Sequence, residues 1–274
     1  MLSIIIPTLN EERYLPHLLA SVRRQQFIEY EVIVSDGGSA DRTLMIAERF
    51  SCRVVLGPAK SPGYQRNRGA EVARGEDLLF LDADTVLPDE EFLAKALAEF
   101  VQQEITVASC SAEPLERAIR YHALLACSNL FLRVMERVYP HVYGGMILAR
   151  RQHHETVGGF DEAPIIGEDG DYVRRLGRLG RFRLLQGVRI LVSMRRFQQY
   201  GIPQMLAVNT LATLLRSLGG SPRYDRFGYR FGHYEGTPCS MQQQQVARAI
   251  GLLLVAERYR GRDTVSSETP GTGT

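Results

Sequence analysis

Short apolar runs alternate with longer amphipathic stretches over the first hundred residues. The runs are rich in strand-forming residues, whereas the stretches between them carry apolar residues at helical spacing. The run 78–81 is apolar on both faces, as in the interior of a parallel sheet. This alternation predicts a doubly wound α/β sheet, which binds ligands at the carboxyl ends of its strands. The predicted strands are 2–7, 31–35, 52–56 and 78–81, and the predicted helices lie around 15–22, 44–47, 64–73 and 88–103.

The second half of the chain is less regular. Residues 142–149 are predicted to form a strand that contains a glycine pair, and residues 182–185 and 188–192 a hairpin or two edge strands. A strand at 105–110, an amphipathic segment at 114–138 and a helix at 169–179 complete this part. We therefore divide the chain into an α/β domain of residues 1–195, a helical extension of residues 196–260 and a tail of residues 261–274. The tail is rich in Gly, Ser and Thr, which predicts disorder.

Cysteine usage and the N-terminal sequence bear on the compartment. The four cysteines are scattered without a CxxC pair, and the apolar run 4–6 leads directly into Pro7 without a signal peptide. Both features favour a cytoplasmic protein. The apolar stretch 202–218 is interrupted by polar residues, which makes it poorer than a spanning helix of roughly 20 apolar residues. It can still lie on a membrane surface, so membrane association remains open.

The strongest chemical signal is the triplet Asp82-Ala83-Asp84, directly after the apolar run 78–81. Its two carboxylates converge on a loop at the carboxyl end of a strand. Such oxygens suit Mg²⁺ or Mn²⁺, hard ions that bridge a protein to a diphosphate and neutralise the charge of a leaving diphosphate. The alternative is an ordinary acidic turn, because a DxD triplet alone also occurs by chance.

Four segments in order resemble family 2 glycosyltransferases, which have the GT-A fold. They are residues 3–11, residues 34–41, the "ARNxG"-like residues 63–69 and residues 81–84. The resemblance implies a Rossmann-like mixed central sheet flanked by helices, with a helical C-terminal extension. It also implies a nucleotide-sugar donor and Mn²⁺ or Mg²⁺ held by Asp84 and Asp82. The nucleotide would be bound by Pro7, Thr8, Asn10, Glu11, Asp36, Arg66 and Asp82, with Asp36 on the base and Arg66 near the phosphates.

Two later segments extend the resemblance to about Arg178. Residues 157–162 resemble the family's "GGFDE" segment and residues 167–175 its "ED" segment. The resemblance implies that Asp169 is the general base of an inverting transfer, next to Glu168 on the donor and acceptor side. An attacking hydroxyl needs such a base, because an alcohol is a weak nucleophile until its proton is removed. The alternative is that Glu168 or Asp169 caps the following helix; one residue can do both.

Further residues were considered for the site. Gly144 and Gly145 resemble the small-residue strand that lets donor and acceptor approach the backbone, although glycine there also has a packing explanation. Residues 174–196 contain eight arginines and no acidic residue, which is compatible with a solvated face, a diphosphate clamp or a surface for anionic lipid. We favour Arg195 or Arg196 near the site. For Arg66 the alternative is a solvated helix face, and His153 and His154 are taken as surface residues.

These observations favour an inverting transfer of a sugar from a nucleotide-diphosphate sugar, a UDP-sugar above all, to an acceptor hydroxyl on a glycan, a lipid or a small molecule. No QxxRW segment is present, which favours a single transfer. The alternatives are a nucleotidyltransferase, which would prefer a Gly-rich, Lys-bearing loop after the first strand, and a nucleotide-sugar-binding protein without turnover. A nucleic-acid partner is not expected. The extension, with aromatic residues Tyr224 to Tyr234 among arginines, favours a peripheral membrane contact or a homo-oligomer interface.

Overall fold

The computed structural model describes residues 1–26, 28–142, 144–163 and 166–217, and all of them belong to one compact unit that extends from Met1 to Glu235. The predicted tail 261–274 and the part of the predicted extension beyond residue 217, including its aromatic residues, lie outside the described residues. Among the described helices, none is both long enough and apolar enough to cross a bilayer. The described cysteines, Cys52, Cys110 and Cys127, are free thiols.

A mixed eight-stranded sheet forms the centre, in the order β3-β2-β1-β4-β7-β6-β8-β5. β3, β2, β1 and β4 are parallel, whereas β7 runs antiparallel to both β4 and β6. The predicted mixed sheet flanked by helices is confirmed. The prediction that β4 lies within a parallel sheet is wrong on one side, because its neighbour β7 runs antiparallel to it. The strands are β1 (Leu2–Thr8), β2 (Tyr30–Asp36), β3 (Arg53–Leu56), β4 (Asp77–Leu81), β5 (Thr85–Val86), β6 (Val107–Pro114), β7 (Met146–Arg150) and β8 (Phe182–Val192).

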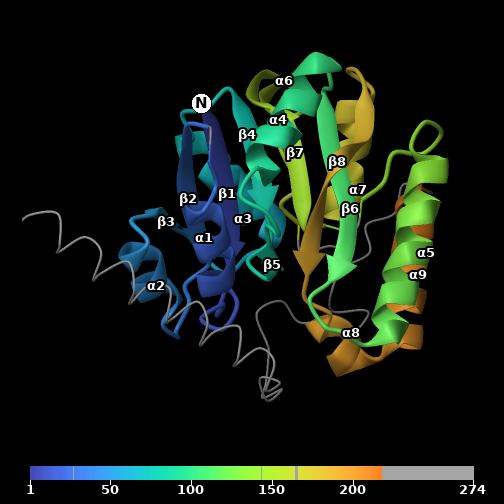
Figure 1. Ribbon diagram of the computed structural model, residues 1–274, viewed down its shortest axis with the longest axis horizontal. Coiled ribbons are helices and arrows are strands. Elements are labelled where there is room, and N and C mark those ends of the chain that lie inside the picture. The colour runs from blue at the N-terminus through green and yellow to red at the C-terminus, as the bar shows by residue number, and fades with distance from the viewer. Residues whose placement is uncertain (27, 143, 164–165, 218–274) are drawn as a thin grey trace, which may run out of the picture. The chain divides into compact units, whose positions relative to one another are not determined.

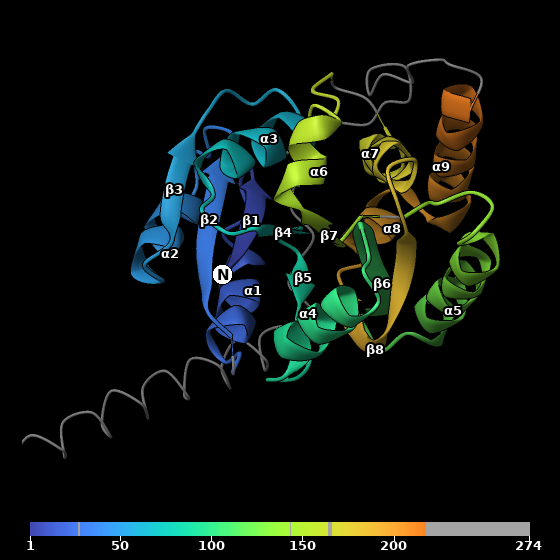
Figure 2. The ribbon, with the colours of Figure 1, turned by 90° about the horizontal axis from the view of Figure 1, so that it is seen from above.

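Helices cover both faces of this sheet, with α1 and α4 on one side and α3, α6 and α7 on the other (Figures 1 and 2). Alternate residues of β1 therefore enter two different cores, Ile4 and Ile6 on one face and Ile5 on the other. The helices are α1 (Leu15–Arg23), α2 (Thr43–Arg49), α3 (Pro62–Val72), α4 (Phe92–Gln102), α5 (Ile119–Met135), α6 (Arg151–Thr156), α7 (Glu168–Gly177), α8 (Arg195–Tyr200) and α9 (Ile202–Ser217).

Two strand predictions need correction. β7 begins at Met146 rather than at 142, because Gly144 and Gly145 have φ of 78° and 83°, outside the strand region. Residues 182–192 form one strand rather than a hairpin. Its register against β6 shifts after Leu185, where the N–H groups of Gln186 and Gly187 donate to the carboxylate of Glu99 instead of to β6. The short elements β5 and α6 were not predicted.

His154 lies in the core, so the prediction of a surface position was wrong for it. The residue is 7% exposed, and its Nδ1 lies 2.7 Å from the hydroxyl of Tyr172. Phe80 and Phe160 pack around the pair. Burial and the charges of two nearby arginines lower the pKa of His154 to about 4, so the ring is neutral at physiological pH. The unpredicted helix α6 gives His154 this inward position.

Candidate active site

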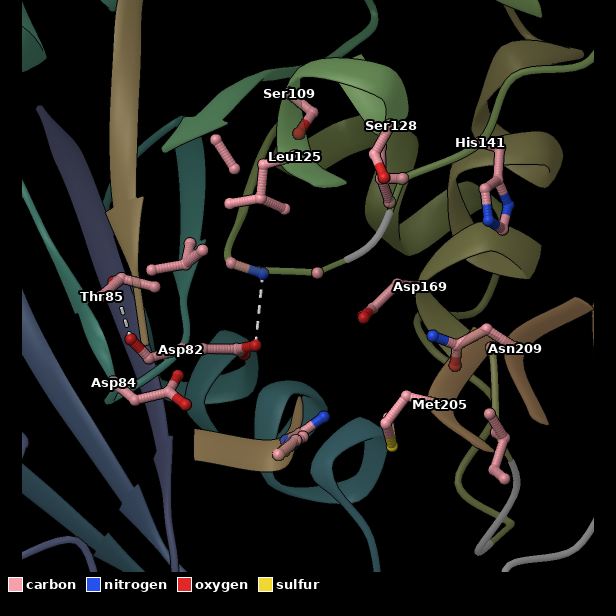
Figure 3. A pocket seen from close by; sticks show the side chains of 18 of the residues that line it. Asp82, Asp84, Thr85, Ser109, Leu125, Ser128, His141, Asp169, Met205 and Asn209 are labelled. Carbon is pink, nitrogen blue, oxygen red and sulfur yellow. Dashed lines mark hydrogen bonds between the residues drawn. The ribbon is translucent and has the colours of Figure 1, made fainter. Parts of the chain in front are cut away.

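The loop after β4 carries Asp82 and Asp84 to a cavity of about 460 Å³ (Figure 3). Thr85 holds the turn, because its N–H and its hydroxyl both donate to the carbonyl of Asp82. β5 then pairs with the end of β8, and the N–H of Ser193 donates to the carbonyl of Asp84 at 3.0 Å. The acidic triplet is thereby fixed between the middle and the edge of the sheet, with both carboxylates lining the cavity.

Arg66 is buried at the floor of this cavity, so a solvated helix face is excluded for it. Only 3% of the residue is exposed. Its guanidinium lies 2.7 Å from Asp82 Oδ1 and 2.7 Å from Asp169 Oδ1, and a third carboxylate, Glu168, lies 3.2 Å away. Burial opposes the ionisation of Asp82, but Arg66, Arg196 and the N–H of Gly145 together outweigh burial and hold the pKa of that carboxyl below its usual value. Arg66 therefore connects the acidic triplet to the first turn of α7.

Asp169 lies in that first turn and faces the cavity rather than capping the helix. The N-cap is Gly167, with φ of 84°, and no side chain makes a capping hydrogen bond there. Burial raises the pKa of Asp169 to about 7; the charges of Glu168 and Asp82 act in the same direction, and Arg66 opposes them. Asp169 is thus a carboxyl with high proton affinity at the edge of a cavity, as general bases commonly are.

Gly144 separates the two groups of carboxylates. A Cβ built on this residue would lie 3.0 Å from Asp169 Oδ2 and 3.2 Å from Asp82 Oδ2. The N–H of Gly145 donates to Asp82 Oδ2 at 3.2 Å, which fixes that carboxylate against the backbone (Figure 3). Because residue 144 has no side chain, the space between the carboxylates of Asp82 and Asp169 stays open.

Arg195 begins α8 and closes the opposite side of the cavity. Its guanidinium makes two bonds of 2.7 Å to Glu11, its Nε lies 2.9 Å from Asp84 Oδ2, and its Cζ lies over the Tyr14 ring, 4.5 Å from the centroid. Arg196 also lines the cavity, and its charge favours the ionised forms of Asp82 and Asp169. The expectation that this arginine pair lies near the acidic triplet thus agrees with the geometry.

Three of the other six arginines of the run 174–196 pair with carboxylates, two of them from distant elements. Arg175 pairs with Asp171, Arg183 with Glu136 and Arg189 with Glu113. Arg181 donates to the carbonyl of Gln103. The run therefore does not form one continuous cationic face in the described part of the chain.

The predicted base-binding residues form a separate, closed network at the ends of β1 and β2. Asp36 is fully buried and accepts four hydrogen bonds: from the hydroxyls of Thr8 and Ser39 and from the N–H groups of Gly38 and Ser39. Asn10, with φ of 58°, is exposed and accepts from the N–H of Ala40. Thr8, Asn10 and Asp36 do not line the described cavity, whereas Pro7 and Glu11 do.

The cavity wall fits a divalent cation by its charge. Five carboxyl groups and three guanidinium groups line it, which gives a formal surplus of two negative charges when every carboxyl is ionised; the residues concerned are Glu11, Asp82, Asp84, Glu168, Asp169, Arg66, Arg195 and Arg196. No group of three or more acidic, His or Cys side chains is arranged as a metal site among the residues that the structure describes. Mg²⁺ in proteins is commonly held by one or two carboxylates, and substrate phosphates complete its coordination. Asp82 and Asp84 can supply these carboxylates.

Several residues of the site were not anticipated. Glu116 accepts from the N–H of Met194 at 3.0 Å and so fixes the start of α8, yet a lone glutamate after a strand gives no signal in a sequence. The sequence likewise does not indicate that Tyr14 contacts Arg195. The side of the cavity formed by α5 and α9 was also missed, because its residues show only the apolar spacing of any amphipathic helix.

Comparison with known proteins adds relatives and neighbours. The chain is 40% identical over 110 residues to the PGL/p-HBAD biosynthesis glycosyltransferase of Mycobacterium bovis, which is 38% of this chain and 43% of that protein. It is 36% identical over 109 residues to the poly(ribitol-phosphate) beta-N-acetylglucosaminyltransferase TarS of Staphylococcus aureus, 37% of this chain and 19% of that protein. The matched segment thus spans less than half of either relative.

Among solved structures, the mannosyltransferase PcManGT from Pyrobaculum calidifontis superposes with a TM-score of 0.66 at 20% identity, covering 82% of this chain and 66% of that one. Glucosyl-3-phosphoglycerate synthase from Mycobacterium tuberculosis superposes with a TM-score of 0.53 at 22% identity, covering 80% of each chain. These likenesses show the GT-A fold. The family model for glycosyl transferase family 2 matches residues 3–158, more than half of the chain. The chain therefore belongs to glycosyl transferase family 2.

Proposed function

We propose that this protein transfers a sugar from a nucleotide-diphosphate sugar to an acceptor hydroxyl, with inversion and in a single transfer. The observation that carries the proposal is the convergence of Asp169 and Asp82 on the open space beside Gly144. A base with raised proton affinity thereby faces the carboxylate that we assign to the donor. Family membership and the nucleotide-sugar complexes of structural neighbours support the same reaction.

In this mechanism Asp169 takes the proton of the acceptor hydroxyl as the oxygen attacks the anomeric carbon. The bond between that carbon and the diphosphate oxygen breaks on the opposite face, so the configuration inverts. Arg66 orients Asp169 and Asp82 through its two contacts of 2.7 Å. Bound at Asp84 and Asp82, Mn²⁺ or Mg²⁺ supplies neutralisation of the charge on the leaving diphosphate. Glu168, Gly144 and Gly145 line the space for the sugar and the acceptor.

For the donor we assign the ends of β1 and β2 to the nucleotide, through Pro7, Thr8, Asn10, Glu11 and Asp36. Two structural neighbours support a UDP-sugar and a divalent cation: TarS was solved with UDP-GlcNAc, and glucosyl-3-phosphoglycerate synthase with UDP and Mn²⁺. The Pyrobaculum mannosyltransferase was solved with GDP-Man and Mn²⁺, so the test also has to identify the nucleobase of the donor. A base contact by Asp36 requires that it exchange one of its four hydrogen bonds.

Arg195 and Arg196 are assigned to the phosphates rather than Arg66. Arg66 is enclosed by three carboxylates, whereas Arg195 contacts two, Glu11 and Asp84, and begins a short helix at the cavity edge. Asp84 and Asp82 would hold the cation, and the Arg195 guanidinium beside Asp84 suits a diphosphate through its paired N–H donors. No observation favours a nucleotidyltransferase, because no Gly-rich, Lys-bearing loop follows β1.

The test is a panel of UDP-, GDP- and other nucleotide-sugars incubated with Mn²⁺ or Mg²⁺ while released nucleoside diphosphate is measured. We expect slow hydrolysis of one donor, lost in Asp84→Asn and kept in the surface control Asp89→Asn. Donor binding without release, even when acceptors are supplied, would instead identify a nucleotide-sugar-binding protein without turnover. Absence of both binding and release across the panel would reject the proposed function.

A further inference from the structure

The cavity continues beyond the carboxylates into a second arm between α5 and α9. Leu125, Ser128 and Phe131 line this arm from α5, and Met205, Leu206 and Asn209 from α9. Figure 3 shows Leu125 and Ser128 across the cavity from Met205, with Asp169 between the two groups. The helices overlap in Figure 1 but stand apart in Figure 2. The arm is therefore a space between two helices that opens directly onto the proposed base.

The lining of this arm differs from that of the rest of the cavity. The described residues that α5 and α9 contribute include no Asp, Glu, Lys or Arg, whereas the other end of the cavity holds five carboxylates and three guanidinium groups. Seven of the described lining residues of α5 and α9 are apolar, and the other five carry an uncharged hydroxyl or amide group. It therefore offers no countercharge to a phosphate or carboxylate, but it can bury apolar surface.

Apolar surface continues outside the arm along both helices. α5 has 17 residues, of which only Tyr121 and Leu132 are buried. Phe131 is 48% exposed and Leu206 is 43% exposed, although both line the cavity. A ligand in the arm can thus extend outward over apolar side chains instead of ending in a closed pocket.

We propose that this arm binds the acceptor, and that the acceptor carries an uncharged, apolar alkyl or aryl body beside its reacting hydroxyl. The inference rests on the proposed function and narrows its acceptor class. The hydroxyl lies at Asp169, and the apolar body runs between α5 and α9. The continuity of the arm with the carboxylate end of the cavity identifies the occupant as a substrate of the same reaction. A hydrophilic glycan would leave this lining unmatched.

The experiment measures transfer from the donor found in the panel to a series of alkyl β-glucosides, from methyl to octyl, below their micelle concentrations. Each methylene that enters the arm should raise kcat/KM about fourfold, the equivalent of burying one CH₂ group. The ratio of octyl to methyl transfer should collapse at least about tenfold in Leu206→Asp and in Phe131→Asp, because burying a charge opposes the alkyl chain. Thermal unfolding confirms that each variant is folded.

Matched controls distinguish binding of the alkyl chain in the arm from non-specific binding to exposed apolar side chains. Leu211→Asp on α9 and Leu130→Asp on α5 change equally exposed apolar residues that do not line the cavity, and they should keep the octyl-to-methyl ratio. Equal transfer to methyl and octyl glucosides, or an equal fall of the ratio in the control variants, would overturn the inference while leaving the proposed function intact. Failure of every donor to be turned over would reject the proposed function, and the inference with it.

Discussion

The two strands that flank β1 end in acidic side chains that are satisfied in opposite ways. At the end of β2, four uncharged donors surround the single carboxylate of Asp36. At the end of β4, one guanidinium serves three carboxylates, those of Asp82, Glu168 and Asp169. The first arrangement is complete without a ligand. The second keeps a surplus of negative charge.

This difference separates a structural role from a chemical one. A carboxylate with all its lone pairs engaged by neutral donors holds a turn in one conformation. Carboxylates that share too few cations attract a cation or a proton, which is what metal binding and base catalysis need. Variants at the two strand ends should therefore fail in different ways.

The largest effect is expected at Asp169. Asp169→Asn removes the proton acceptor but keeps the shape, so transfer should fall by about 10²–10⁴-fold while donor binding is retained. Asp171→Asn, on the same helix but paired with Arg175 away from the cavity, is the matched control and should stay close to wild type. The measurement is single-turnover transfer together with donor titration. Equal losses in both variants would contradict the assignment of the base.

Removal of the cation should come next. Chelation with EDTA or the change Asp84→Asn should lower turnover by about 10²–10³-fold, because a bound cation contributes several kcal/mol of charge stabilisation at the leaving diphosphate. Re-addition of Mn²⁺ or Mg²⁺ should restore the chelated wild type but not Asp84→Asn. Full turnover in EDTA would remove the divalent cation from the mechanism.

At the closed strand end the expected effect is on stability. Asp36→Ala leaves buried hydroxyl and N–H groups without an acceptor, so the free energy of unfolding should fall by about 2–4 kcal/mol. Asp169→Asn should not lower this free energy, because burial already disfavours the ionised form of that carboxyl. Urea unfolding of both variants measures the contrast. A larger loss of stability for Asp169→Asn than for Asp36→Ala would reverse the comparison.

The pH dependence gives the mildest effect. Asp169 must be deprotonated to act as a base, and burial raises its pKa to about 7. The transfer rate should therefore fall about tenfold per pH unit below 7 and level off above it. The residual rate of Asp169→Asn should lack this step. A wild-type profile that is flat between pH 5 and 8 would show that another group accepts the proton.

Much of the sheet and of its acidic edge was predictable because local sequence decides it. The apolar run before Asp82 forms a fully buried strand, and the carboxyl ends of β1, β2 and β4 meet at one edge by topology. The GT-A fold followed from the order of several short motifs rather than from any one of them. The roles of the individual residues remain predictions, now with a geometry that supports testing them.

Other features depend on contacts between segments far apart in the sequence. The residue pattern of α3 is compatible with a solvent-exposed position for Arg66. In the structure Arg66 is buried against carboxylates that lie 16 to 103 positions further along the chain. Gly144 and Gly145 resemble strand residues until their positive φ values are known. The extra residues of β8 are held by Glu99 of α4. The burial of Arg66 and the register of β8 depend on tertiary contacts, and the backbone conformation of the glycine pair depends on its place in the fold. Hydrophobic periodicity reveals none of these.

Gly144 also bears on how other chains of the family are interpreted. A methyl group there would stand within 3.0–3.2 Å of both Asp169 and Asp82 and would fill the space on which they converge, with every acidic residue intact. The positive φ adds a further cost of about 1–2 kcal/mol for any larger residue. A search for inactive homologues that checks only the acidic motifs would miss such a chain. The absence of a side chain is as diagnostic as the presence of a carboxylate.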